Sequence, residues 1–375
     1  MKYNKKFINA LAVYVGTIIG VGLFGLPYVG AQSGFLILFF YLILVGFITA
    51  TINIFYAEVA AETKGLHRLP GYAQMYIGNW AKPIAFFVKT LAIFGSLLAY
   101  LIIGGQFLAN LFNGPVYLYT FIFFILGAFL IWKDKKSIGP VELIMLFIFI
   151  GTIIFLFFSG IGEIVFANLK EITIKNMFVP YGVIIFSLYG ASIIPEIKEE
   201  LKGNLQQIKK LIIVGLIICI AIYVIFNLLI IGISGSNTAE DAISGLEGSL
   251  GTWVLDIGYV FGIIATFTSF IALGLTVKKL FRYDYKLPKK LGWFLACFIP
   301  LGLFIAGLQD FISVIGITGA VMLGIDGILV VIIYFKLKQK QKNKSMKLIK
   351  LLGYSIIGLL TLGVVLEFVQ FVTGS

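Results

Sequence analysis

Residues 16–27 have the sequence GTIIGVGLFGLP, which places four glycines and one proline inside the first strongly apolar run of the chain. In a helix interior, glycine costs about 1 kcal/mol relative to alanine and proline costs about 3 kcal/mol. Inside lipid, irregular backbone survives only where it is buried in protein or lines a polar cavity, because unpaired backbone groups are costly there. The stretch therefore predicts a broken membrane helix beside a binding site.

The composition places this stretch in a polytopic membrane protein. The chain of 375 residues is 60% hydrophobic and 12% charged, with a mean hydropathy of +1.05. Soluble domains carry about 25% charged residues, so a large soluble core does not account for these values. The net charge of +12 would suit a nucleic-acid binder, but the basic residues separate apolar runs instead of forming one face. We therefore expect a lipid bilayer around the protein and no nucleic-acid partner.

Eleven apolar runs are long enough to cross a bilayer, since a spanning helix needs about 20 residues. They predict an all-α integral membrane protein with about eleven transmembrane helices. The predicted spans are 7–31, 35–61, 84–112, 115–132, 139–161, 178–197, 211–233, 253–281, 290–308, 311–335 and 347–372.

The distribution of Lys and Arg predicts the orientation. With eleven spans, 26 of the 29 basic residues lie in the N-terminus and in the connections that face the same side. The opposite side holds Lys170 and Lys175, and Lys89 lies inside the third span. Because cytoplasmic loops carry an excess of Lys and Arg, we expect a multi-pass cell membrane protein. Its N-terminus would be cytoplasmic and its C-terminus outside.

The sixth span is also irregular, since Pro180, Gly182 and Pro195 interrupt it. Spans one and six are five apart, and they would enter the membrane from opposite sides. Paired interrupted segments of this kind indicate the midplane site of a secondary transporter built from inverted repeats. We therefore divide one transporter domain, 1–375, into repeat one (1–161), repeat two (178–335), and a basic linker with helix 11 (336–375).

In span order, these features resemble the amino acid/polyamine/organocation transporter superfamily, and most closely its amino acid/auxin permease and aromatic amino acid permease branch. The resemblance rests on the glycine-rich stretch through Pro27, on residues 186–201 with their Ser-x-x-Gly break, and on TFTSF and LGL within residues 266–275. It implies a five-plus-five inverted repeat (LeuT-type) with discontinuous helices 1 and 6, plus one accessory C-terminal helix.

The same resemblance implies a sodium site between the first and eighth helices. The matching ligands are the carbonyls of Gly16, Ile19 and Ala265 and the side chains of Thr268 and Ser269. Neutral oxygens suit a hard cation, although both hydroxyls could instead bond back to carbonyls of their own helix. Some proton-coupled relatives have a fifth-span lysine at this place. The fifth span here has none, which favours sodium and leaves protons as the alternative.

The substrate contacts that the resemblance implies are backbone groups. A half-helix N-terminus presents free N–H groups to a carboxylate, and a half-helix C-terminus presents carbonyls to a cation. We expect the carboxylate of an amino acid at the amides near Val21 and Gly22, and its amine at the carbonyls around Phe186 and Tyr189. Three further candidates lie in the same two breaks, namely Gly20, Ser187 and Leu188.

Other residues have simpler interpretations beside functional ones. Gly16 and Gly20 also match the small-residue motif of close helix packing. Asp326 lies deep in the tenth span, and an intramembrane carboxylate is a functional candidate by default. We interpret Lys89 as snorkelling to the interface, and Glu58 and Glu196 as partners of basic residues near the membrane surface.

The sequence lacks the residues that an enzymatic function would need. It has one histidine, His67, and no thiol pair, Ser-His-Asp set or Walker loop. We predict a secondary active transporter that imports a neutral or aromatic amino acid, with sodium as the coupling ion, no other cofactor and no obligatory protein partner. Proton-coupled permease is the alternative mechanism. An amino acid-sensing receptor of the same fold is the alternative from another class.

Overall fold

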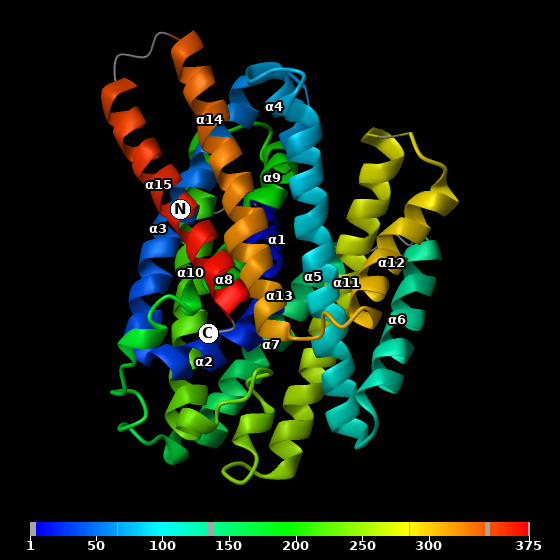
Figure 1. Cartoon of the computed structure of the whole chain (residues 1–375), viewed down its shortest axis with the longest axis vertical. Coiled ribbons are helices and arrows are strands. Elements are labelled where there is room, and N and C mark those ends of the chain that lie inside the picture. The colour runs from blue at the N-terminus through cyan, green and yellow to red at the C-terminus, as the bar shows by residue number, and fades with distance from the viewer. Residues whose placement is uncertain (1–4, 66, 134–138, 285, 342–345, 374–375) are drawn as a thin grey trace.

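The computed structural model describes residues 5–65, 67–133, 139–284, 286–341 and 346–373, and most of them lie in helices (Figure 1). The helices are α1 (Lys5–Ile18), α2 (Gly22–Ser33), α3 (Phe35–Glu62), α4 (Leu69–Tyr76), α5 (Ala81–Phe112), α6 (Val116–Lys133), α7 (Gly139–Gly160), α8 (Pro180–Leu188), α9 (Ile194–Glu200), α10 (Leu205–Ser234), α11 (Thr252–Asp284), α12 (Lys289–Ile305), α13 (Phe311–Ile317), the π-helix η6 (Thr318–Leu323), α14 (Gly324–Lys340) and α15 (Met346–Thr373).

Every predicted span coincides with one of these helices, with a helix pair or, for the tenth, with the continuous α13–η6–α14 segment. By length and composition, eight helical segments of the described chain can cross a membrane, and α1 with α2, bent by 51°, makes a ninth. The helix α12 has 17 residues and falls outside this count. An all-helical membrane protein is therefore confirmed, while the number of eleven spans and the repeat boundaries stay predictions.

Both predicted helix breaks are present. The helix α1 ends at Ile18, and the Gly20 amide turns back to the Ile18 carbonyl at 2.9 Å before α2 begins. The helix α8 ends at Leu188, Tyr189 is extended, and α9 starts with Pro195 in its first turn. Proline suits that position because its missing N–H would have no intrahelical partner there.

Glycines let the two breaks approach each other closely. A β-carbon at Gly22 would overlap the Ser187 hydroxyl and would lie 3.0 Å from Ser187 Cα. A β-carbon at Gly190 would lie 2.8 Å from the ring of Tyr14 and 2.9 Å from Ile18. The glycines that make each helix weak are therefore also the residues that bring the two breaks together.

The helices pack as two groups. The first helix group consists of α1, α2, α3, α8, α9 and α10, and the second helix group consists of α5, α6, α11 and α12. Direct contacts between the two groups are few in the described part of the chain, and α7 and the α13–η6–α14 segment pack against both. The accessory helix α15 packs mainly against α14 (Figure 1). A boundary with few direct contacts permits one group to move relative to the other.

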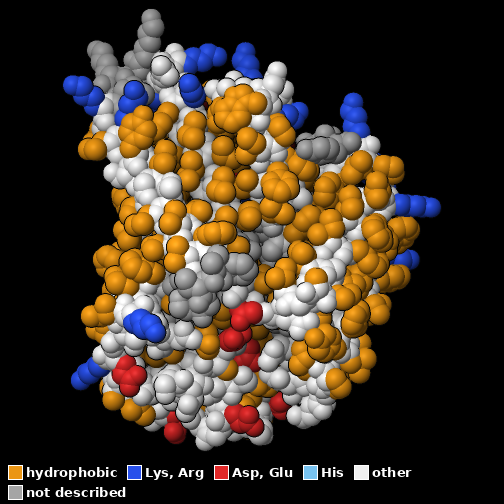
Figure 2. All heavy atoms as spheres, viewed as in Figure 1, with side chains coloured by type: hydrophobic (Ala, Val, Ile, Leu, Met, Phe, Trp, Pro, Cys, Tyr) orange, Lys and Arg blue, Asp and Glu red, His pale blue; other side chains and the backbone are white. Residues whose placement is uncertain are grey.

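The surface has a hydrophobic belt between two charged ends (Figure 2). Large apolar side chains of the membrane helices, such as Phe40, Phe87 and Phe158, are exposed, as contact with lipid requires. Lys and Arg gather at the end that carries α4 and α9, which we call the basic end. Most of the Asp and Glu residues in view gather at the opposite, acidic end.

Candidate functional site

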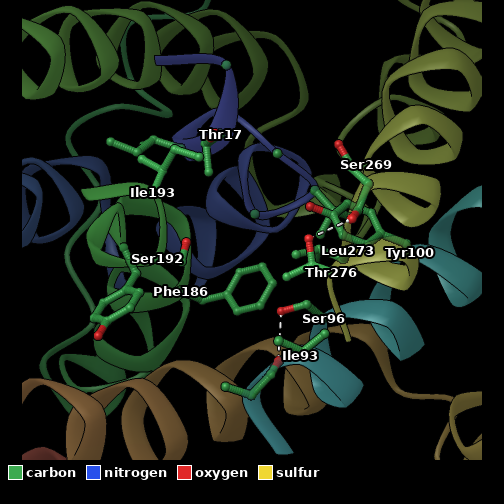
Figure 3. Close-up of a pocket in the computed structure, with 18 of the residues that line it drawn as sticks. Thr17, Ile93, Ser96, Tyr100, Phe186, Ser192, Ile193, Ser269, Leu273 and Thr276 are labelled. Carbon is green, nitrogen blue, oxygen red and sulfur yellow. Dashed lines mark hydrogen bonds between the residues drawn. The ribbon is translucent and has the colours of Figure 1, made fainter. Parts of the chain in front are cut away.

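A cavity of about 540 Å³ lies between the two helix groups and reaches both helix breaks. One wall comes from α1, the start of α2 and the α8–α9 break, and the other comes from α5 and α11. Figure 3 shows Phe186 and Ser192 of the first group facing Ser96 and Thr276 of the second. A volume of this size is within the range of small-molecule sites.

The cavity brings together six of the seven predicted substrate residues. Gly20, Val21 and Gly22 line it at the first break, and Phe186, Ser187 and Tyr189 line it at the second. The remaining candidate, Leu188, is fully buried and does not line the cavity. The Ser187 hydroxyl donates to the Val183 carbonyl at 2.7 Å, so its proton is used in a hydrogen bond within its own helix. The backbone at the breaks therefore fits the substrate prediction better than these side chains do.

A residue that sequence reasoning missed joins the two breaks. The buried Tyr223 hydroxyl of α10 lies 3.0 Å from the Ile18 carbonyl and 2.8 Å from the Ser187 carbonyl, and it donates to both. Each carbonyl belongs to the last turn of a half-helix, where intrahelical partners are absent. Tyr223 gives no sequence signal, because it is one of 18 tyrosines and stands in an ordinary apolar run.

All five predicted sodium ligands line the same cavity, namely Gly16, Ile19, Ala265, Thr268 and Ser269. The Thr268 hydroxyl donates back to the carbonyls of Ile264 at 3.0 Å and Ala265 at 3.1 Å. A hydroxyl or carbonyl oxygen that shares one hydrogen bond keeps a lone pair for a cation. The predicted donors are neutral oxygens, and neutral oxygens suit a hard cation. The donor chemistry that the sequence predicts is therefore present on the cavity surface.

Tyr100 of α5 lines the cavity opposite the first break. Its hydroxyl would lie 2.9 Å from a β-carbon at Gly20, so the second helix group approaches the predicted carboxylate-binding backbone here.

The interpretation of Lys89 as a snorkelling residue is wrong. Its ammonium lies 3.5 Å from Asp326 Oδ2, and its side chain is 16% exposed. The Tyr189 hydroxyl donates to the same Asp326 oxygen. Lys89 also lines the cavity, where its ammonium lies 5.4 Å from the centroid of the Tyr189 ring. The buried carboxylate therefore has a partly buried cation as its partner.

Basic partners hold Glu58 and Glu196 at the basic end, as predicted. Glu58 accepts from Lys209 at 2.5 Å and pairs with Lys338 at 2.8 Å. At the cavity mouth, Arg68 pairs with Glu196 at 3.1 Å, and both side chains are exposed. Lys198 donates to the carbonyls of Thr63 and Gly65. The cavity thus extends to a polar mouth at the basic end.

Aromatic side chains separate the cavity from the acidic end. Phe24 lies in the first turn of α2 beyond the break, and its ring centroid is 4.9 Å from that of Phe107 and 6.4 Å from those of Phe226 and Phe261. All four rings are buried. The site is therefore closed on this side while it extends to the opposite end.

Solved membrane transporters share this fold. The nucleobase-cation-symport-1 family transporter Mhp1 superposes with a TM-score of 0.67 at 11% identity, over 96% of this chain and 91% of that one. MhsT, solved in complex with L-phenylalanine, gives a TM-score of 0.58 at 16% identity, over 97% of this chain and 98% of that one. The manganese transporter of Eremococcus coleocola gives a TM-score of 0.69 at 12% identity, over 97% of this chain and 87% of that one. These likenesses confirm the LeuT-type fold.

Two broken helices around a central cavity, in a fold that transporters share, define a membrane transporter. The sequence model of the tryptophan/tyrosine permease family matches residues 3–370, and the chain belongs to this family. A tyrosine-specific transport system of Haemophilus influenzae is 25% identical over 292 residues, which are 72% of this chain and 71% of that relative. The protein is thus a secondary amino acid transporter and not an enzyme.

Proposed function

We propose that this transporter imports an aromatic amino acid by alternating access. The observation that carries the proposal is the cavity between the two helix groups, because it joins both helix breaks and extends to one end only. The family description, the tyrosine-specific relative and the phenylalanine complex of MhsT support an aromatic substrate. The substrate carboxylate would lie at the amides of Val21 and Gly22, and its amine at the carbonyls around Phe186 and Tyr189.

The charge distribution supports the orientation of the site. Because cytoplasmic segments are rich in Lys and Arg, we assign the basic end to the cytoplasm of the cell, the N-terminus inside and the C-terminus outside. The structure is then an inward-open state. The rings of Phe24, Phe107, Phe226 and Phe261, which we call the Phe24 cluster, block the path to the outside. Movement of the first helix group relative to the second would close the mouth at the basic end and separate the rings of the Phe24 cluster. The substrate would then enter from outside.

We further propose sodium as the coupling ion, held by the carbonyls of Gly16, Ile19 and Ala265 and the hydroxyls of Thr268 and Ser269. Support comes from the place of all five residues on the facing walls of one cavity and from the neutral oxygen donors. Proton coupling is the second candidate, and the observation that favours it is the ionisable pair of Lys89 and Asp326 beside the cavity. In both cases the coupling cation and the amino acid would occupy neighbouring parts of one cavity.

Transport by purified protein in liposomes tests both parts of this proposal. We expect labelled tyrosine or tryptophan to accumulate when an inward sodium gradient is imposed, and to equilibrate without accumulation when potassium replaces sodium. The double substitution Thr268→Ala and Ser269→Ala should raise the half-saturating sodium concentration about tenfold, which corresponds to about 1.4 kcal/mol of lost cation binding.

Thr276→Ala is the matched control, because Thr276 also lines the cavity from α11 and also donates back to its own helix, at 2.9 Å to the Ala272 carbonyl. Its half-saturating sodium concentration should stay unchanged. Accumulation that follows a pH gradient and ignores sodium would replace sodium with protons in the proposal. Binding of the amino acid without any uptake would instead support a receptor.

A further inference from the structure

Three side chains from different parts of the fold meet at the edge of the cavity. Tyr189 comes from the break in the first helix group, Lys89 from α5 in the second group, and Asp326 from α14, which packs against both. The Tyr189 hydroxyl and the Lys89 ammonium share one oxygen, Asp326 Oδ2. We call these three residues the buried triad.

The burial of this triad needs an explanation other than stability. Asp326 is 1% exposed, and its second oxygen, Oδ1, has no hydrogen-bond partner in the described part of the chain. Desolvation of two charges offsets much of their attraction, so a buried ion pair is weak evidence for stabilisation. Intramembrane charges are expensive and are typical of functional positions. A charge pair kept beside a transport cavity therefore indicates a role in transport.

The position of Tyr189 shows what the pair can control. Tyr189 follows the last residue of α8 and is extended, with φ −77° and ψ 102°, so helical hydrogen bonds do not fix its backbone from that side. Its side chain contacts Asp326 through the hydroxyl and Lys89 through the ring, and Tyr189 lines the cavity together with Phe186. On the other side, Tyr223 holds the Ser187 carbonyl. The break is thus anchored at two points, two residues apart.

From this arrangement we infer that Lys89 and Asp326 are positioning residues, which hold Tyr189 so that the carbonyls of the α8–α9 break face the substrate amine. Asp326 accepts the Tyr189 hydroxyl, and Lys89 neutralises Asp326 while its ammonium lies against the Tyr189 ring. Neither residue needs to touch the substrate. The inference rests on the proposed function, since it concerns the amine end of that amino acid site.

The first test is Tyr189→Phe in liposomes, with uptake measured against substrate concentration. Loss of the hydroxyl frees the break, so the half-saturating concentration of labelled tyrosine should rise about tenfold, the loss expected for a hydrogen bond to a charged group. The maximal rate per folded molecule should stay within about twofold, because the transport cycle itself is intact. Asp326→Asn in the Tyr189→Phe background should add no further rise, since residues acting through one contact are not additive.

Tyr334→Phe is the matched control. Tyr334 also donates to a carboxylate in an ion pair, at 2.9 Å to Glu58, but it does not line the cavity. The half-saturating concentration of labelled tyrosine for Tyr334→Phe should equal that of the unmodified protein. Lys89→Met leaves the Asp326 charge buried alone and should lower the melting temperature, and Lys89→Met with Asp326→Asn should restore it.

Three results would overturn the inference. The first is an unchanged half-saturating concentration in Tyr189→Phe, and the second is a rise of equal size in Tyr334→Phe. The third is a full additional loss on adding Asp326→Asn to Tyr189→Phe. Failure of the proposed function would look different, since the unmodified protein would then accumulate no labelled aromatic amino acid at all.

Discussion

Gly22→Ala is expected to reduce uptake about tenfold or more per folded molecule, because the added methyl group forces apart the two breaks that form the predicted substrate site. Overpacking costs about 1–3 kcal/mol, and each 1.4 kcal/mol of it that appears as lost substrate binding is a factor of ten. The added β-carbon would overlap the Ser187 hydroxyl and would lie 3.0 Å from Ser187 Cα, which cannot move without moving α8. The two breaks must then separate, and the predicted carboxylate and amine sites separate with them. Uptake of labelled tyrosine at several concentrations measures the loss.

Gly302→Ala is the control for this prediction. Gly302 lies in α12, and a β-carbon there meets no atom within 4 Å, so uptake should be unchanged. A second substitution tests the mechanism directly. Ser187→Gly removes the hydroxyl and the β-carbon that the new methyl group meets, so Gly22→Ala with Ser187→Gly should recover part of the uptake. Full uptake by Gly22→Ala alone would contradict the close approach of the two breaks.

The sequence predicts the two breaks because their cause is local. Glycine and proline weaken a helix wherever they stand, and lipid makes that weakness costly. A run such as residues 16–27 therefore reveals an irregular helix without knowledge of its neighbours. This local pattern placed the breaks, and the family resemblance then named Gly22 and Ser187 within them as site residues. The structure brings these two residues into close approach.

Side-chain contacts between residues far apart in the chain could not be predicted from the sequence. Lys89 and Asp326 are 237 positions apart, and Tyr223 is 205 positions from Ile18. A lysine six residues into a span has the same local pattern whether it snorkels to the surface or pairs with a buried carboxylate. The snorkelling interpretation of Lys89 failed because periodicity reports depth in the membrane and not the neighbouring helix. Leu188 was grouped with the site by its position in the break, but its side chain packs into the core.

Tyr223→Phe is the second substitution from which we expect a large loss. The single hydroxyl proton of Tyr223 is shared between the Ile18 and Ser187 carbonyls, which end α1 and α8. Without it, the Ser187 carbonyl loses this partner, while the Ile18 carbonyl keeps the Gly20 amide. Leaving one buried acceptor unsatisfied costs about 1–3 kcal/mol. We expect a lower melting temperature and a reduction of uptake about tenfold or more, since both breaks lose the group that fixes them.

Tyr181→Phe separates these two effects. Tyr181 lies in α8, and its hydroxyl donates to the Leu359 carbonyl of α15 at 3.1 Å, away from the cavity. The substitution Tyr181→Phe should therefore lower the melting temperature to a similar extent and leave uptake per folded molecule unchanged. Equal uptake by Tyr223→Phe and Tyr181→Phe would mean that the shared hydroxyl only stabilises the fold. A loss confined to Tyr223→Phe would mean that Tyr223, by occupying the Ser187 carbonyl, decides which carbonyls of the break remain for the substrate amine.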